Sequence, residues 1–193
     1  MIEQKDTANR LQNFAREYRP EIRFVLIFLV IVGLGFKLVY NKTVADHVIV
    51  PITELETLVA SKILNLSFVG YPNRQKGTVL SGTGGNPFRM EVRNNCNGVY
   101  ESIVFLAAFI AIQIPWRRKI GWVSFGFFLF HLVNEARLVS LFIIGSSYST
   151  QTFDFFHETF WQYTLVIVTL GIFLFCANRV TKMERPAPVK EAA

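Results

Sequence analysis

Cysteine and histidine are scarce in this sequence. Its 193 residues include two cysteines, Cys96 and Cys176, and three histidines. A structural zinc site takes four such ligands at short, regular spacings, and these few residues do not supply them. A disulfide would need the two cysteines to be neighbours, whereas the topology derived below places them on opposite sides of a membrane. We therefore expect two free thiols, no metal and no other cofactor.

Two patterns that point to nucleotides are also missing. The glycines between positions 77 and 85 are not followed by the Lys-Ser/Thr pair that completes a phosphate-binding loop. The net charge of +6 is not gathered in a basic stripe on a soluble module. We therefore expect no nucleic-acid partner and interpret the charge as a signal of membrane topology.

Long apolar runs, in contrast, dominate the chain. Hydrophobic residues make up 51% of it, and 19 of them are phenylalanines. A helix of ~20 apolar residues crosses a bilayer core that is ~30 Å thick. We predict four transmembrane helices, at about residues 24–40, 97–114, 120–144 and 160–178. The predicted fold class is an all-α integral membrane protein, a single membrane-embedded domain over residues 1–193 that is surrounded by membrane lipids.

The segment between the first two runs, residues 41–95, is predicted to lie outside the membrane. Its first part combines apolar residues at helical spacing with charges that are costly in the bilayer centre. The apolar residues are Ile52, Leu55, Val59, Ile63 and Leu66. We predict an extracytoplasmic amphipathic helix that lies on the membrane surface or packs on the other helices, and we favour packing. A short β-hairpin should follow, with the arms Val79–Leu80 and Phe88–Val92.

Basic residues indicate the orientation of the chain. Lysine and arginine gather in the N-terminal segment, in the turn Pro115–Lys119 and in the C-terminal tail. By the positive-inside rule, these three segments share the cytoplasmic side of the membrane. Both termini are therefore predicted to be cytoplasmic, the tail over residues 181–193 to be disordered, and Cys96 to face the other side.

Cys96 lies where a polar segment becomes an apolar helix. Its neighbours Asn95, Asn97 and Gly98 are polar or flexible, unlike the usual surroundings of a packing cysteine. If the helix begins near Asn95, the thiol lies in its first turn, where unpaired N–H groups and the helix dipole favour a thiolate. The pattern therefore indicates a nucleophile.

Three other polar side chains are predicted at the depth of this thiol. Asn134 and Arg137 lie one to two turns from the outer end of the third run, and His157 precedes the fourth. An arginine in a membrane helix is rare without a functional or pairing reason. One such reason is an ion pair with Glu101 or Glu135, but this would not explain a cysteine and a histidine at the same depth.

These motifs resemble the exosortase/archaeosortase family, and most closely its exosortase H branch. The residues that carry the resemblance are Cys96-Asn97-Gly98-Val99, the turn Pro115-Trp116-Arg117-Arg118-Lys119, Asn134-Glu135-Ala136-Arg137 and Phe153-Asp154-Phe155-Phe156-His157-Glu158. Many members of the family have serine or alanine at the position of Asn97. This departure points to a branch of the family and not to a loss of activity.

The resemblance implies a cysteine protease or transpeptidase of the bacterial inner membrane, with its active site on the periplasmic side. Cys96 would be the nucleophile, Arg137 the second catalytic residue and His157 the third. The partners would be exported proteins with a C-terminal sorting signal, made of a short motif, a membrane helix and a basic cluster. In the exosortase H branch, the motif would resemble Ile-Pro-Thr-Leu followed by Trp-Gly.

The same residues suit acyl transfer, which needs a nucleophile, a proton carrier and a donor to the oxyanion. We expect Cys96 to form an acyl-enzyme, His157 to move the proton, and Arg137 to hold the oxyanion or the thiolate. The expected supporting residues are Asn134, Asn97, Glu101 and Glu135. The first of these lies one turn from the arginine and would orient it, and the two carboxylates would balance charge.

Two other functions are compatible with the sequence. A non-catalytic membrane subunit would use its polar residues only for packing, and Cys96→Ser would then leave its function intact. A small transporter would use Glu101, Glu135, Arg137 and His131, and it would need polar residues through the full depth of the bilayer. Most of the polar residues lie in the outer half, which favours the enzyme.

Overall fold

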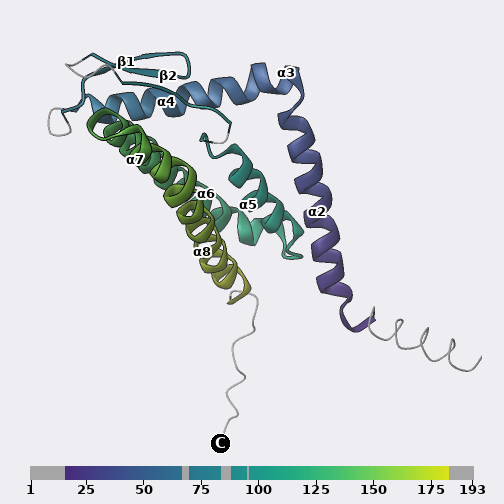
Figure 1. Cartoon of the computed structure of the whole chain (residues 1–193). Coiled ribbons are helices and arrows are strands. Elements are labelled where there is room, and N and C mark those ends of the chain that lie inside the picture. Colours follow the sequence, from purple (N-terminus) through teal and green to yellow (C-terminus); the bar gives the residue numbers. More distant parts are fainter. Residues whose placement is uncertain (1–15, 67–69, 84–87, 95, 183–193) are drawn as a thin grey trace, which may run out of the picture.

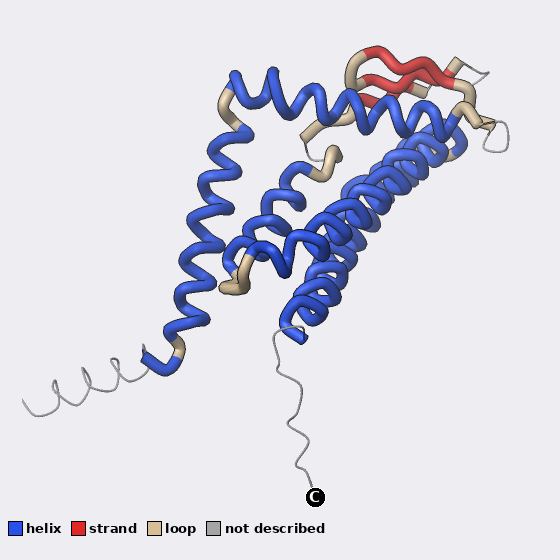
Figure 2. The backbone as a smooth tube through the Cα atoms, turned by 180° about the vertical axis from the view of Figure 1, so that it is seen from behind, coloured by secondary structure: helices blue, strands red, loops and turns tan. Residues whose placement is uncertain are grey.

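The computed structural model describes residues 16–66, 70–83, 88–94 and 96–182. In this part of the chain, long helices form a bundle, and a shorter helix and a small sheet lie across one end of it (Figure 1). The start of α2 and the end of α8 lie at the opposite end in both views (Figures 1 and 2). That this shared end faces the cytoplasm stays a prediction.

Among the described residues, three helices are long and apolar enough to cross a membrane. They are α2 (Arg19–Val39), α6 (Trp116–Ser147) and a continuous run of α7 (Thr150–Asp154), a π-helical turn η2 (Phe155–Phe160) and α8 (Trp161–Lys182). Each overlaps one of the predicted apolar runs. Because α8 continues through Lys182, the first two residues of the predicted disordered tail are helical, and residues 183–193 lie outside the described part.

The second predicted span is shorter than expected. The helix α5 (Val99–Ala111) has 13 residues, which is ~20 Å at 1.5 Å per residue and less than the ~30 Å of a bilayer core. It packs on α2, where Phe36 meets Tyr100 edge-on at 5.4 Å between ring centroids. The described helices therefore comprise three candidate spans and one shorter apolar helix.

The outer segment begins with a helix that crosses the end of the bundle. It consists of α3 (Lys42–Val44), the π-helical turn η1 (Ala45–Ile49) and α4 (Val50–Leu64). The predicted packing is found, but on the opposite face of the helix. The buried positions are mostly small or polar (Thr53, Glu56, Thr57, Ala60 and Ser61), and the apolar Leu64 is buried with them. Of the five apolar residues expected on the packed face, Ile63 is half-buried, and the exposed ones, which are free to face lipid, are Ile52, Leu55, Val59 and Leu66.

In the described part of the chain, three antiparallel strands stand beside α4, one more than the predicted hairpin has. They are β1 (Asn73–Lys76), β2 (Val79–Gly82) and β3 (Arg89–Glu91), in the spatial order β1-β2-β3. The β2–β3 pair is the predicted hairpin. The prediction missed β1 because the sequence Asn-Arg-Gln-Lys has no apolar alternation. Gly77, with φ of 59°, provides the left-handed turn that folds β1 onto β2.

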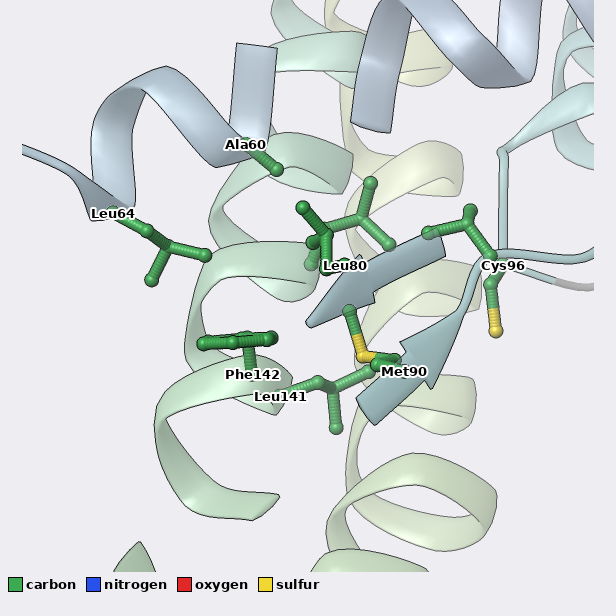
Figure 3. Packing of buried hydrophobic residues seen from close by; sticks show 9 residues of the cluster. Ala60, Leu64, Leu80, Met90, Cys96, Leu141 and Phe142 are labelled. Carbon is green, nitrogen blue, oxygen red and sulfur yellow. The ribbon is translucent and has the colours of Figure 1, made fainter. Parts of the chain in front are cut away.

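Two apolar clusters fill the interior of the described chain. One joins the sheet, α4 and the neighbouring part of α6, and it includes the Cys96 side chain (Figure 3). The other lies between α5, α6 and α8 and contains Phe105, Phe109 and Cys176. Both cysteines are free, as predicted. The first cluster packs the sheet on α6 and so places Cys96, which follows β3, beside this helix.

Candidate active site

Cys96 lies in the turn between β3 and α5. The prediction that it lies in the first turn of the helix is wrong. The helix begins at Val99, with Gly98 as its N-cap. The backbone N–H groups of Cys96 and Asn97 both donate to the carbonyl oxygen of Arg93, at 2.7 and 3.1 Å. These N–H groups are engaged in the turn, so the expected stabilisation of a thiolate by free helix donors does not apply.

The Asn-Gly pair holds this turn in place. The Asn97 side chain is buried, and its Nδ2 donates to Oγ1 of Thr53 on α4 at 2.7 Å. Its Oδ1 accepts from the backbone N–H of Val99 at 3.1 Å. Gly98 has φ of 65°, and a Cβ atom there would lie 2.9 Å from Phe130. Close packing and backbone conformation together therefore favour glycine after the asparagine.

His157 reaches the cysteine from the helical run that includes α8. Its Nε2 lies 2.9 Å from the Cys96 Sγ atom, within hydrogen-bonding distance. The imidazole stacks on Phe153, with 5.6 Å between the ring centroids and 15° between the ring planes. His157 belongs to the π-helical turn η2, a local insertion that occurs frequently at functional sites. The turn and the stacking partner together orient the ring.

The helix α6 supplies two further predicted residues. Arg137 is only 1% exposed, and its Nη2 lies 3.7 Å from the sulfur of Cys96. One turn earlier, the buried Asn134 places its Nδ2 3.4 Å from the carbonyl oxygen of Cys96. The structure thus brings together four of the predicted site residues from three separate segments.

The two predicted carboxylates lie on α5 and α6 near this group. Glu101 is in the first turn of α5, and Glu135 follows Asn134 on α6. Among the described residues, the Oε2 atom of each is buried without a hydrogen-bond partner. A pairing of Arg137 with either carboxylate stays a prediction.

A second polar group beside the cysteine was not predicted. Glu56 on α4 is buried, and its Oε1 lies 2.9 Å from Nδ1 of His131 on α6. The other ring nitrogen of His131 is 3.3 Å from Oγ of Ser102 on α5. His131, Asn134 and Arg137 recur every three residues along α6, which was an available signal. Glu56 is 75 residues away from its partner in the sequence, so no local pattern could reveal it.

Burial dominates the ionisation of Cys96, which precedes the short apolar helix α5. Desolvation raises the pKa of its thiol, the guanidinium of Arg137 opposes this by lowering it, and Glu101 adds to the rise. The net direction is upward, so the resting group at neutral pH is a thiol and not the predicted thiolate. Burial likewise raises the pKa of Glu56 on the surface helix α4, although His131 lowers it. A nucleophilic sulfur here therefore needs a base to remove its proton.

The sulfur and the imidazole border a cleft of about 340 Å³. One wall is formed by residues 88–93, which include the strand β3. The other wall is apolar and is formed by Leu138 and Leu141 of α6 and Phe153 of α7. The cleft therefore offers a backbone edge, an apolar surface and a thiol–imidazole pair to a bound molecule.

Apolar helices with a buried cysteine and arginine and a half-buried histidine at one end of the bundle define the class of this chain, a membrane protein with a thiol placed to act as a nucleophile. Comparison with known families refines this class. Residues 18–176 match the transmembrane exosortase family model (Exosortase_EpsH), and the chain belongs to this family of cysteine peptidases and transpeptidases. The matched range includes Cys96, Arg137 and His157. No curated protein and no solved structure matches the chain.

Proposed function

We propose that this chain is a membrane cysteine transpeptidase, or a protease when water is the acceptor, that cleaves the C-terminal sorting signals of exported proteins. The observation that carries the proposal is the position of the Cys96 sulfur, 2.9 Å from His157 Nε2 and 3.7 Å from Arg137 Nη2, at the edge of a cleft. A thiol between a base and a fixed cation suits acyl transfer.

In the proposed reaction, His157 Nε2 takes the thiol proton as the Cys96 sulfur attacks the scissile carbonyl carbon. A carbon–sulfur bond forms, and the negative charge moves to the carbonyl oxygen, where the guanidinium of Arg137 stabilises it. The tetrahedral intermediate then breaks its carbon–nitrogen bond. The leaving amine takes the proton from the imidazolium, and a thioester on Cys96 remains.

The second half of the reaction releases the product. An acceptor with an O–H or N–H group gives its proton to His157 and attacks the thioester carbon. The carbon–sulfur bond then breaks, and the thiol is restored by the same proton. Water as the acceptor gives a protease, whereas a lipid or sugar acceptor gives a transpeptidase.

The placement of the site supports a membrane-anchored substrate. The cleft lies beside the sheet, at the end of the bundle that α4 crosses. A substrate that ends in its own membrane helix would present the residues that precede this helix at the same level. We propose that this level is the periplasmic face of a bacterial inner membrane, and that the short motif of the sorting signal occupies the cleft.

Co-expression with a reporter protein tests the proposal. The reporter ends in the three-part signal, with Ile-Pro-Thr-Leu and Trp-Gly as the motif, an apolar helix and a basic cluster. Wild-type enzyme should shorten the reporter, and Cys96→Ala, Arg137→Ala and His157→Ala should each leave it intact. The matched control is Cys176→Ala, which removes the other thiol. Equal cleavage by Cys96→Ala and wild type would exclude the mechanism.

A transporter remains the alternative that a specific observation favours, because the buried Glu56 and the half-buried His131 and Ser102 form a row of polar contacts. Against a transporter, the space between α5, α6 and α8 is filled by the apolar cluster that contains Phe105 and Phe109. A proton-flux assay in liposomes separates the two functions, since only a transporter would give a flux that depends on Glu56. A non-catalytic subunit predicts that Cys96→Ser is silent in both assays.

A further inference from the structure

The outer edge of β3 lies in the same cleft as the candidate nucleophile. The sheet order places β3 next to β2 only, and among the described strands none pairs with its other side. The cleft is bordered by residues 88–93 on this side and by Cys96 and His157. In Figure 3, the sulfur of Cys96 points past the strand that carries Met90, away from the strand that carries Leu80.

The register of the sheet shows which backbone groups face outward. Gly82 N–H donates to the carbonyl of Phe88, and Val92 N–H donates to the carbonyl of Thr78, both at 2.8 Å. With Leu80 opposite Met90, the even-numbered residues of this segment therefore bond to β2. In an antiparallel pair the residues between them direct their N–H and C=O groups away from the partner strand. The outward groups are those of residues 89 and 91.

The side chains alternate in the same way. Met90 and Val92 are buried, whereas the Arg89, Glu91 and Arg93 side chains are exposed. An extended peptide that pairs with β3 would point every second side chain toward the apolar wall formed by Leu138, Leu141 and Phe153. The cleft thus combines main-chain donors and acceptors for affinity with an apolar surface for alternate side chains, as in other strand-addition sites.

We propose that the substrate binds as an added β-strand on the outer edge of β3, which sets its scissile carbonyl at Cys96. This inference rests on the proposed function and specifies how the substrate is held. The ligand is an extended peptide segment in which every second side chain is apolar and faces the cleft wall. Backbone N–H and C=O groups of Arg89 and Glu91 bond to every second residue of this segment.

Disulfide cross-linking tests the proposal without relying on the reaction. The enzyme carries Cys96→Ala and Cys176→Ala together with either Arg89→Cys or Glu91→Cys. The reporter described above carries a single cysteine that is moved stepwise along the residues before its membrane helix. Strand pairing predicts that Arg89→Cys and Glu91→Cys each cross-link at alternate reporter positions, and that their preferred positions lie two residues apart. The control is Arg74→Cys, which lies in the same register row two strands away and should give no cross-link.

A second variant tests the backbone directly. Glu91→Pro removes an N–H that points away from β2, so the sheet should persist. In the Arg89→Cys enzyme it should lower the cross-link yield about tenfold, as expected for the loss of one well-placed hydrogen bond. The variant Glu91→Ala keeps the N–H and should retain the yield.

The outcomes separate this proposal from the proposed function. Reporter cleavage by wild type without cross-links at alternate positions, or with equal cross-links at successive positions, overturns strand pairing and leaves the enzyme assignment standing. Alternating cross-links without cleavage by wild type support strand pairing and overturn the reaction. Neither cleavage nor cross-links overturns both.

Discussion

At the scale of single residues, the resting state of Cys96 decides how the site can work. The thiol is buried beside the imidazole of His157 and the permanent cation of Arg137. Desolvation raises the pKa of the thiol by more than the guanidinium lowers it. The proton therefore stays on sulfur until substrate and His157 act together. This arrangement also protects a free cysteine from unwanted oxidation, because the thiolate is the reactive form.

Alkylation of Cys96 should reveal the raised pKa. In a Cys176→Ala chain, the rate of reaction with iodoacetamide should rise with pH and reach its midpoint above the ~8.5 of an ordinary cysteine. Arg137→Gln removes the charge that lowers this pKa, so its midpoint should move to still higher pH, while Arg137→Lys should stay near wild type. Mass spectrometry of the modified peptide measures the rates. A midpoint below that of free cysteine would contradict the burial argument.

Gly98 should be the most sensitive glycine near the site. Gly98→Ala places a Cβ 2.9 Å from Phe130 and requires φ of 65°, which costs of order 1–3 kcal/mol for a residue other than glycine. We expect a lower thermal unfolding temperature in detergent and slower Cys96 alkylation. Gly121→Ala is the matched control, because it lies in α6 with no atom within 4 Å of the new methyl group. Equal unfolding temperatures for the two variants would refute the assigned role of Gly98.

At the scale of elements, α4 is bound to the bundle by polar contacts. Thr53 meets Asn97, Glu56 meets His131, and Ser61 donates to Asn73 of β1 at 2.7 Å. These contacts join the helix to α6, to the sheet and to the turn that carries the thiol. The position of the nucleophile therefore depends on α4, although α4 contributes no group that touches the sulfur among the described contacts.

Glu56 should act as a positioning residue. Glu56→Ala leaves the half-buried His131 without its hydrogen-bonding partner, and the loss of such a partner costs about 1–3 kcal/mol. Glu56→Gln keeps the size and a hydrogen-bonding oxygen and should retain most of the stability. We expect slower Cys96 alkylation in the alanine variant and near-normal alkylation in the glutamine variant. The double variant Glu56→Ala/His131→Ala tests the coupling. If its loss of unfolding free energy equals the sum of the losses in the two single variants, the pair does not couple the two helices.

Sequence patterns predicted some of these elements and missed others for physical reasons. Long apolar runs predicted α2, α6 and α8, because a bilayer demands such runs. The strand β1 and the buried face of α4 escaped, because their polar residues are satisfied by partners distant in the chain, such as Asn73 for Ser61. The residue types of the candidate site were found through their motifs. The start of α5 at Val99 was not predicted, because it depends on the conformation of Gly98 and on the packing of Phe130.

At the scale of the whole molecule, polar and apolar regions divide the bundle. The end that α4 crosses carries the sheet, the candidate site and the Glu56–His131 pair, whereas α2 exposes apolar side chains along most of its length. If the sheet end lies at a membrane surface, as the proposed function requires, the candidate site is at the boundary between lipid and water. Such a site can meet both a membrane-anchored peptide and an acceptor from either phase.

Thiol labelling should determine the orientation. In chains without native cysteines, Thr83→Cys reports the sheet end and Lys182→Cys the end of α8. Both positions are exposed. The positive-inside rule predicts that a membrane-impermeant maleimide labels the first in cells with a permeabilised outer membrane, and the second only after lysis. The reverse pattern would place the candidate site on the cytoplasmic side.

The most direct measurement is the mass of the enzyme during turnover of the reporter. Rapid acid quenching followed by mass spectrometry should find a thioester on the peptide that contains Cys96, labile to hydroxylamine and absent from Cys96→Ala. Reporter cleavage that proceeds with no adduct on this peptide, or that continues in Cys96→Ala, would contradict the assignment of Cys96 as the nucleophile.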